Sequence, residues 1–186
     1  LRLIVGITGA SGLAYAADFL RAAFAAGLEL RIVVTPEALT VARREMDLGI
    51  ASPAAFDVAA FCGAPEMKGS PRVIVHDPFD FAAPPASGTF RVRGMVVVPC
   101  SMRSLGALAS GVTDNLLLRA ADCQLKEGRP LVLVPRETPL SQIHLENMTR
   151  LARAGAVILP AMPAYYYRPA AIADHERFLT SKMCDR

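Results

Sequence analysis

The sequence predicts an α/β fold with a doubly wound parallel sheet, a three-layer sandwich of strands between helices. Short apolar runs alternate with longer helical patterns along the whole 186-residue chain, as in strands joined by crossover helices. Apart from Arg31, the strand segments are apolar instead of alternating, which is typical of a sheet covered on both faces. No internal repeat and no polar or Pro/Gly-rich linker divides the chain, so residues 1–186 are expected to form one domain.

The first elements follow from apolar runs and their end signals. A strand over 3–5 leads through a glycine-rich turn into an Ala-rich helix over 13–26. Gly27 is expected to end this helix, because glycine readily takes the left-handed conformation of a helix C-terminus. The run 30–34, apolar except for Arg31, predicts the second strand, and the helix after it spans about 37–45.

The middle of the chain is less regular. A short helix is expected near 54–61 and the third strand over 73–75, followed by a Pro-rich loop from Asp77 to Gly88. Loops of this length are uncommon in compact domains, so a functional role is expected for it. The fourth strand covers 95–98.

The second half of the chain returns to regular alternation. The expected elements are helices over 102–110 and 115–126, a strand over 131–134, a helix over 139–154, a strand over 157–159 and a terminal helix. Ser101 and Thr138 stand where a hydroxyl would cap the following helix, and Pro139 suits a first helical position. Capping alone would explain both hydroxyls, and an anion site at these helix starts is the alternative.

The turn after the first strand is the first candidate for ligand binding. Gly6, Gly9 and Gly12 recur at three-residue intervals, which keeps side chains away from the backbone amides, and Ser11 is placed to cap the next helix. Bare amides and the positive end of a helix dipole indicate a phosphate-bearing ligand. The spacing is not the dinucleotide fingerprint, and a tight strand-to-helix connection is the other interpretation.

Polar residues follow several other strands and should meet this turn at the carboxyl edge of the sheet. Thr35 follows the second strand, Pro99 to Ser104 the fourth, Arg136 to Pro139 the fifth, and a Pro- and Tyr-rich stretch the sixth. Ligands of doubly wound sheets bind outside the carboxyl ends of the strands. The convergence of these turns therefore predicts one ligand site at that edge.

Composition and charge argue against several classes of protein. The net charge is +3, from 20 basic and 17 acidic residues that are interspersed, so no nucleic-acid partner is expected. No apolar run is long enough to span a membrane, and the first residues form a core strand instead of a signal peptide. The four cysteines form no Cys-x-x-Cys pair, which argues against a zinc ribbon and for reduced thiols in the cytoplasm. A hydrophobic content of 53% indicates faces buried against other subunits of a homo-oligomer.

Arg119 and Lys126 lie seven residues apart on one expected helix, hence on one face, with Asp122 between them. A solvated ladder of ion pairs is one interpretation. The other is a cationic pocket for a second phosphate, formed together with Arg136, because guanidinium groups match phosphate oxygens. Glu137 is either the salt-bridge partner of Arg136 or a group that handles protons.

A nicotinamide-dependent reductase is the main rival explanation of the glycine-rich turn. The second strand, however, ends in Val33, Val34 and Thr35, without the carboxylate that would bind the adenosine ribose. No Tyr-x-x-x-Lys pair occurs either. A flavin with a single phosphate fits these residues better.

A set of motifs spread along the chain resembles the UbiX-type flavin prenyltransferases (UbiX/Pad), which were formerly described as aromatic acid decarboxylases. The motifs are Gly9–Gly12, Pro99–Met102, Gly111–Leu117, Arg119–Asp122, Leu125–Glu127, Arg136–Ser141, Ile143–Leu145 and Asn147–Met148. The resemblance implies a flavodoxin-like (Rossmann-like) fold, usually assembled as a homododecamer. It also implies a flavoprotein that joins the dimethylallyl group of dimethylallyl monophosphate to N5 and C6 of reduced FMN. The product, prenylated FMN, serves UbiD-type decarboxylases.

Position by position, the resemblance implies three groups of site residues. The implied FMN contacts are Gly9, Ala10, Ser11, Thr35, Ser101, Met102, Arg103, Ser104 and Arg136. The implied prenyl-phosphate contacts are Tyr166, Lys182, Lys126 and Arg136, and the implied catalytic residues are Glu137, Lys126, Arg119 and Glu45. Many relatives carry arginine where Lys182 stands, and lysine keeps the charge but loses the bidentate geometry. No metal is implied, and the sequence has no Asp-Asp-x-x-Asp motif to hold magnesium on a diphosphate.

The implied reaction has clear electrostatic requirements. Breaking an allylic C–O bond develops positive charge on carbon and negative charge on phosphate, so catalysis needs cations at the oxygens and an electron-rich, dry surface at the carbon. The stretch from Tyr165 to Tyr167 and the reduced flavin would supply that surface. The departing phosphate, Glu137 or Glu45 would take the proton from flavin C6.

Two other functions stay open at the level of sequence. A flavin-dependent cysteine decarboxylase would share the fold, but its Pro-Ala-Ser-Ala-Asn-Thr signature is replaced here by Pro99 to Ser104. It would also need a catalytic histidine, whereas His144 is expected to be structural. A non-catalytic flavin-binding partner of a decarboxylase is the second alternative.

Overall fold

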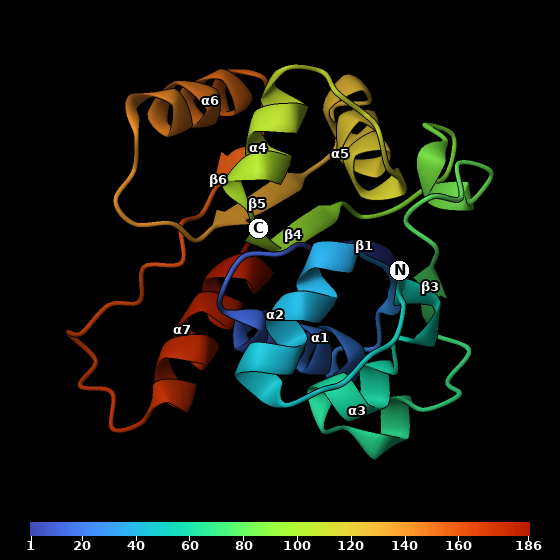
Figure 1. Ribbon diagram of the computed structural model, residues 1–186, viewed down its shortest axis with the longest axis vertical. Coiled ribbons are helices and arrows are strands. Elements are labelled where there is room, and N and C mark those ends of the chain that lie inside the picture. Colours follow the sequence, from blue (N-terminus) through green and yellow to red (C-terminus); the bar gives the residue numbers. More distant parts are fainter.

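The computed structural model describes residues 1–186 as one parallel sheet of six strands with helices on both faces (Figure 1). The strands are β1 (Arg2–Ile7), β2 (Glu29–Val34), β3 (Val73–His76), β4 (Met95–Cys100), β5 (Leu131–Pro135) and β6 (Val157–Ile158). They lie in the order β3-β2-β1-β4-β5-β6. The chain thus builds outward from β1 in one direction and from β4 in the other, which confirms the doubly wound sheet.

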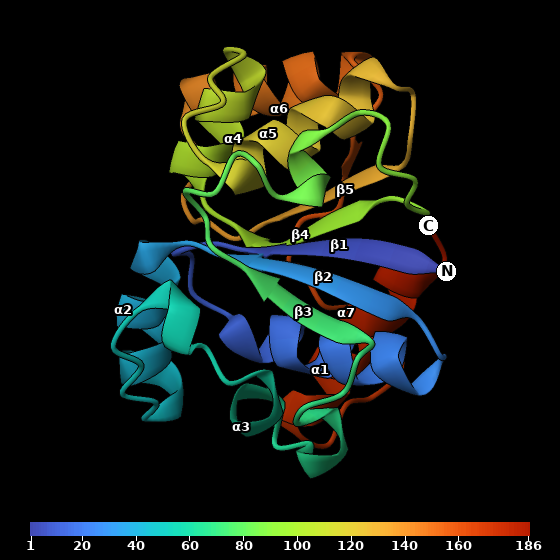
Figure 2. The same cartoon turned by 90° about the vertical axis from the view of Figure 1, so that its right-hand side faces the viewer.

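Seven α-helices connect and flank the strands. They are α1 (Leu13–Ala25), α2 (Pro36–Met46), α3 (Val58–Cys62), α4 (Met102–Ala109), α5 (Leu116–Lys126), α6 (Gln142–Arg153) and α7 (Ile172–Cys184). Helices α1, α2, α3 and α7 cover one face of the sheet, and α4, α5 and α6 cover the other (Figure 2). This three-layer arrangement confirms the flavodoxin-like fold. None of the helices combines the length and the apolar character that a membrane crossing requires.

Alternate residues of the central strands pack against opposite helical layers. In β1, Val5 and Ile7 belong to the apolar core on the α1 side, whereas Ile4 belongs to the core on the α5 side. Burial on both faces explains why the central part of these strands is almost entirely apolar. A Cβ atom on Gly6 would lie only 2.9 Å from the side chain of Leu117, so α5 packs directly on the backbone of β1.

The start of α6 corrects the boundary predicted from Thr138 and Pro139. The N-cap is Ser141, whose Oγ accepts a hydrogen bond from His144 N at 3.3 Å. In return, His144 Nδ1 accepts from Ser141 N at 3.3 Å. This reciprocal capping pair fixes the helix start at Gln142 and gives His144 the structural role that was expected.

The irregular middle of the chain contains less helix than predicted. The segment expected as a helix near 54–61 divides into a 3-10 turn, Pro53–Ala55, and the short α3. Asp57 separates them, because its carboxylate caps α3 by accepting from Ala59 N at 2.9 Å and Ala60 N at 3.1 Å. The Pro-rich loop after β3 contains one further 3-10 turn, Pro84–Ala86.

The topological switch point lies between β1 and β4. After β1 the chain turns to the face covered by α1, and after β4 it turns to the face covered by α4 (Figure 2). The two loops therefore diverge at the carboxyl edge of the sheet, on the left in Figure 2. Ligands of doubly wound sheets bind in the crevice that such a divergence opens.

Candidate functional site

One buried hydroxyl, that of Thr8, joins the two loops that diverge at the switch point. Thr8 Oγ1 donates to Pro99 O at 2.7 Å and accepts from Ser101 N at 2.8 Å. Thr8 is 1% exposed, so water does not compete for these bonds. The loop after β1 and the start of α4 are therefore held in a fixed relation.

Gly9 brings the same loop against α2. A Cβ atom at this position would lie 2.5 Å from Glu37 Cβ and 3.0 Å from the Glu37 carbonyl carbon, so no side chain fits there. The prediction that this glycine keeps a side chain out of the loop is confirmed. As a result, the first turns of α1, α2 and α4 surround one loop.

Ser11 does not cap α1, contrary to the prediction. The N-cap is Gly12, which has a φ of 100°, and no side chain of its own caps the helix. Instead, the Glu45 carboxylate at the end of α2 accepts from Gly12 N at 3.0 and 3.2 Å and from Leu13 N at 3.1 Å. A full negative charge suits the positive end of a helix dipole better than a hydroxyl does. The first amides of α1 therefore already bind an anion that the chain itself supplies.

The starts of α2 and α4 present hydroxyl groups to the crevice. Thr35 is the N-cap of α2, yet its Oγ1 is buried and has no hydrogen-bond partner. Buried hydroxyls nearly always have a partner, so this one indicates a site for a ligand. Ser101 caps α4 as predicted, accepting from Ser104 N at 3.2 Å and donating to Ser104 Oγ at 3.1 Å.

A cavity of about 80 Å³ separates the first turns of α2, α4 and α5, and Thr35 and Arg103 are among its lining residues. The Arg103 guanidinium lies 3.8 Å from the carboxylates of both Glu37 and Asp114, and its side chain is 61% exposed, so it is loosely held. An unpartnered hydroxyl, a loosely held guanidinium and helix N-termini together fit a phosphate monoester. We call this set the carboxyl-edge site; it comprises Thr35, Ser101, Arg103 and Ser104.

Arg136 extends the site toward the glycine-rich loop. Its Nε donates to Ser11 O at 3.3 Å. A second cavity, of about 240 Å³, lies beside it and is lined by residues 135–138 and by methionines of α6 and of the segment after β6. Glu137 accepts from Thr138 N at 3.0 Å and forms no ion pair with Arg136, so its own turn holds it.

The aromatic segment after β6 packs on α7. Tyr167 stacks on Phe178 with ring centroids 5.2 Å apart, and its hydroxyl shares a hydrogen bond of 3.0 Å with His175 Nδ1. The Tyr166 ring packs edge-on against the same Phe178 ring, with the ring centroids 6.2 Å apart. Lys182 Nζ lies 5.7 Å from the centroid of the Phe178 ring. The structure thus brings Tyr166 and Lys182 together around Phe178.

Tyr15, in the first turn of α1, connects this aromatic segment with the sheet edge. Burial raises the pKa of Tyr15, the Glu176 carboxylate and Tyr167 raise it further, and the Arg136 guanidinium lowers it. Because these groups shift the pKa of Tyr15, the start of α1, the aromatic segment and Arg136 lie close together.

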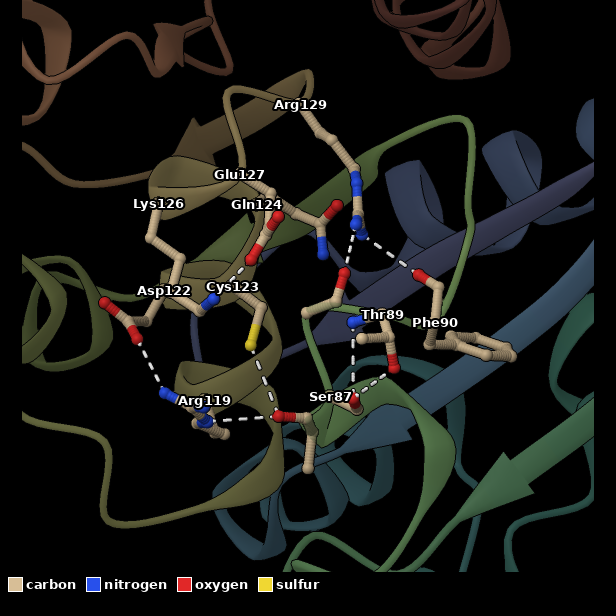
Figure 3. Close-up of polar contacts among 12 residues, drawn as sticks. Ser87, Thr89, Phe90, Arg119, Asp122, Cys123, Gln124, Lys126, Glu127 and Arg129 are labelled. Atoms are coloured by element: carbon tan, nitrogen blue, oxygen red, sulfur yellow. Dashed lines mark hydrogen bonds and ion pairs between the residues drawn. The ribbon is translucent and has the colours of Figure 1, made fainter.

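Arg119 and Lys126 do not join Arg136 within one chain. Arg119 pairs with Asp122 at 2.9 Å, and Lys126 pairs with Glu127 (Figure 3). Helix α5 leads into the amino end of β5, whereas Arg136 follows its carboxyl end, so the length of the strand separates Lys126 from Arg136. Of the two interpretations left open by the sequence, the ion-pair one is confirmed for Arg119 and Asp122. The other, a cationic pocket shared with Arg136, is not formed within an isolated chain.

Sequence reasoning did not single out Thr8, although a signal was present. Thr8 directly follows a strand whose last residue, Ile7, is completely buried. A hydroxyl at such a position must find a protein partner. In a doubly wound sheet, the neighbouring loop after β4 is the nearest source of one.

Comparison with known proteins places the chain among flavoproteins. A family model described as flavoprotein matches residues 1–178. A flavin prenyltransferase UbiX of Synechocystis sp. is 40% identical over 184 residues, which cover 99% of this chain and 89% of that protein.

Two solved structures resemble this chain in both fold and sequence. A crystal structure of AnUbiX (PadA1) in complex with FMN and dimethylallyl pyrophosphate has a TM-score of 0.86 and 41% identity, covering 99% of this chain and 90% of that one. A dodecameric FMN-dependent Ubix-like decarboxylase from Escherichia coli O157:H7 has a TM-score of 0.87 and 40% identity, covering 100% and 93%. The FMN-dependent cysteine decarboxylase TvaF, at 18% identity over 96% of this chain and 98% of its own and a TM-score of 0.57, shares the fold alone.

Replacing the hydroxyl that joins the two loops should destabilise the protein. We expect Thr8→Val to lower the free energy of unfolding by about 1–3 kcal/mol, because Ser101 N is left buried without its acceptor. Urea denaturation measures this difference. Thr8→Ser, which keeps the hydroxyl, is the matched control, and equal stabilities of the two variants would contradict the role assigned to Thr8.

Proposed function

Because the chain belongs to the UbiX family of flavin prenyltransferases, we propose that it transfers a dimethylallyl group from dimethylallyl monophosphate to N5 and C6 of reduced FMN. The observation that carries the proposal is the carboxyl-edge site, where a buried hydroxyl without a partner and a loosely held arginine fit the phosphate of a flavin mononucleotide. The product is prenylated FMN, with a UbiD-type decarboxylase as its user. Four free thiols support a cytoplasmic location.

The FMN phosphate is assigned to the starts of α2 and α4. Thr35 Oγ1 donates to it, and Arg103 supplies the charge. The amides of Met102 and Arg103 have no acceptor inside α4 and are available to it, whereas Ser104 N is already bound by Ser101 Oγ. The start of α1 is not assigned to this phosphate, because the Glu45 carboxylate occupies it.

The remaining FMN contacts that the sequence resemblance implies lie next to these groups. Gly9, Ala10 and Ser11 form the loop that Thr8 fixes against α4, and Arg136 is hydrogen-bonded to that loop. This loop and Arg136 therefore border the space assigned to the rest of the flavin.

The cations implied for the prenyl-phosphate site are not all brought together around Arg136 by one chain. Lys182 and Tyr166 share the surroundings of Phe178, but Arg119 and Lys126 lie at the other end of β5. We therefore assign Arg119 and Lys126 to the site of a neighbouring subunit. The dodecameric state of the Escherichia coli relative supports this assignment. Exposed apolar side chains on α6, Ile143 at 68% and Leu145 at 50%, support it as well.

The protein's task in the reaction is to stabilise separating charges. As the allylic C–O bond breaks, Arg136 and Lys182, with Lys126 of the neighbour, stabilise the negative charge that grows on the phosphate oxygens. Exposed rings of Tyr165 and Tyr166 provide an electron-rich surface for the positive allyl group. Reduced FMN supplies the nucleophilic atoms.

Proton removal from the flavin has three candidate acceptors. The departing phosphate comes first, and Glu137 and Glu45 follow. Glu137 is held by its own turn through Thr138 N, and Glu45 is held by the amides of α1. The nearby thiol of Cys100 is not a candidate, because full burial raises its pKa to about 12 and keeps it protonated.

The histidines argue against cysteine decarboxylation, which would require one of them at the flavin. His144 caps α6, and His175 is bonded to Tyr167. His76 ends β3, on the outer strand of the sheet, and does not line the cavity that contains Thr35 and Arg103. Prenyl transfer needs no histidine and therefore fits this chain better.

Incubation with reduced FMN and a dimethylallyl donor tests the function directly. We expect mass spectrometry to detect a flavin heavier by one five-carbon unit, with faster conversion of the monophosphate than of the diphosphate. Unmodified FMN after incubation with both donors, under conditions in which FMN is bound, would favour a non-catalytic flavin-binding protein instead.

The hydroxyl of Thr35 should contribute to FMN affinity. We expect Thr35→Val to weaken FMN binding by about 1.5–3 kcal/mol, the range for a hydrogen bond to a charged group. Titration followed by flavin fluorescence measures the dissociation constant. Thr35→Ser should bind FMN nearly as the wild type does, and an unchanged affinity of the valine variant would remove Thr35 from the phosphate site.

Mixed oligomers test whether one site draws on two subunits. Lys126→Ala and Arg136→Ala should each lose prenyl transfer when expressed alone. Co-expressed in equal amounts, they should recover activity, because about one quarter of randomly assembled sites then contain both wild-type side chains. Recovery no greater than the sum of the two variants measured separately would show that both residues act from the same chain.

A further inference from the structure

A short segment, Ala86–Phe90, lies against α5 and the turn that follows it, and is fastened there through its backbone (Figure 3). Its first carbonyl oxygen accepts from Arg119 Nε at 3.1 Å and from Cys123 Sγ at 3.3 Å. Its last carbonyl oxygen accepts from Arg129 Nη1 at 2.9 Å, and Gly88 O accepts from Nη2 of the same guanidinium. The segment is thus held at both ends and in the middle.

Gly88, the central residue of this segment, lies directly against the ion pair of Lys126 and Glu127. A Cβ atom on Gly88 would lie 2.7 Å from Lys126 Nζ and would also collide with the Glu127 carboxylate. The backbone of Gly88 is not in the left-handed region, so its conformation does not require glycine. The absence of a side chain is explained by the room that the ion pair needs.

The position of the Lys126 ammonium depends on its contacts with Gly88 and Glu127. A lysine side chain has many rotamers, and this one is 45% exposed, so the helix alone does not determine where its charge lies. The contact with Gly88 and the pairing with Glu127 restrict it to the side of α5 that also carries Arg119 (Figure 3).

We propose that Gly88 is a positioning residue for prenyl transfer. By lacking a side chain, it sets the position of the Lys126 ammonium, which then meets the phosphate of the prenyl donor in the neighbouring subunit. The fastened segment 86–90 holds Gly88 in place, and Arg119 is held by the same segment. This inference rests on the proposed function.

Substitution of Gly88 separates this role from folding. The atoms that a new Cβ would meet are the ends of two flexible side chains, which move without disturbing the backbone. Gly88→Ala should therefore fold normally while displacing the ion pair. Gly49→Ala is the matched control, because Gly49 has open space around it and no positive φ.

Steady-state kinetics on the holo-oligomer test the proposal. We expect Gly88→Ala to raise KM for dimethylallyl monophosphate at least fivefold, with the FMN dissociation constant and Tm unchanged, whereas Gly49→Ala behaves as the wild type. In the inactive Lys126→Ala background, binding of dimethylallyl monophosphate is measured instead, and Gly88→Ala should not lower this affinity further, because it acts through Lys126. An unchanged KM, or an added loss in the Lys126→Ala background, would overturn the proposal.

A structural measurement tests the role of Gly88 independently of whether the protein transfers a prenyl group. If the wild type transfers no prenyl group, a crystal structure of Gly88→Ala still tests the positioning. A displaced Lys126 side chain would support the role of Gly88, and a Lys126 side chain in its present position would overturn it.

Discussion

The hydrogen bonds of Thr8 are the constraint on which the site depends. A doubly wound sheet sends the chain to opposite faces after β1 and β4, and this divergence opens the crevice. Without a connection, the two loops would be free to separate. Thr8 Oγ1 bonds both Pro99 O and Ser101 N, so the loop at Gly9 and the start of α4 keep one geometry. The helix N-termini that face a ligand are thereby held in place before it binds.

We propose that anion binding at this edge is divided between Glu45, which belongs to the chain, and the phosphate of a ligand. Glu45 neutralises the start of α1 from within the chain, while Thr35 at the start of α2 keeps a buried hydroxyl without a partner. Arg103 stands loosely between two carboxylates, Glu37 and Asp114. A phosphate that enters between α2 and α4 gains these groups without competing with Glu45.

Much of the fold is predictable because its signals are local. Continuous apolar runs indicate buried parallel strands, and the Ser101 cap directly precedes the helix that it starts. The start of α6 was predicted at Thr138 and Pro139, but the cap is Ser141, and this outcome depends on a reciprocal bond from His144. Neighbouring hydroxyls look equivalent in sequence until that partner is placed.

The parts of the site that escaped prediction depend on distant contacts. Glu45 replaces Ser11 as the cap of α1 across more than thirty positions, which no local pattern reveals. Helical periodicity correctly placed Arg119 and Lys126 on one side of α5, but it carries no information about Arg136 at the far end of β5. Only the placement of β5 between them shows that one chain cannot unite these cations.

A crystal structure of the oligomer with FMN and dimethylallyl monophosphate would test the central claim most directly. We expect the FMN phosphate between the starts of α2 and α4, with Glu45 still bound to the amides of α1. We also expect the second phosphate between Arg136 of one subunit and Lys126 of its neighbour. An FMN phosphate that displaces Glu45, or a Lys126 side chain that faces only solvent, would contradict this claim.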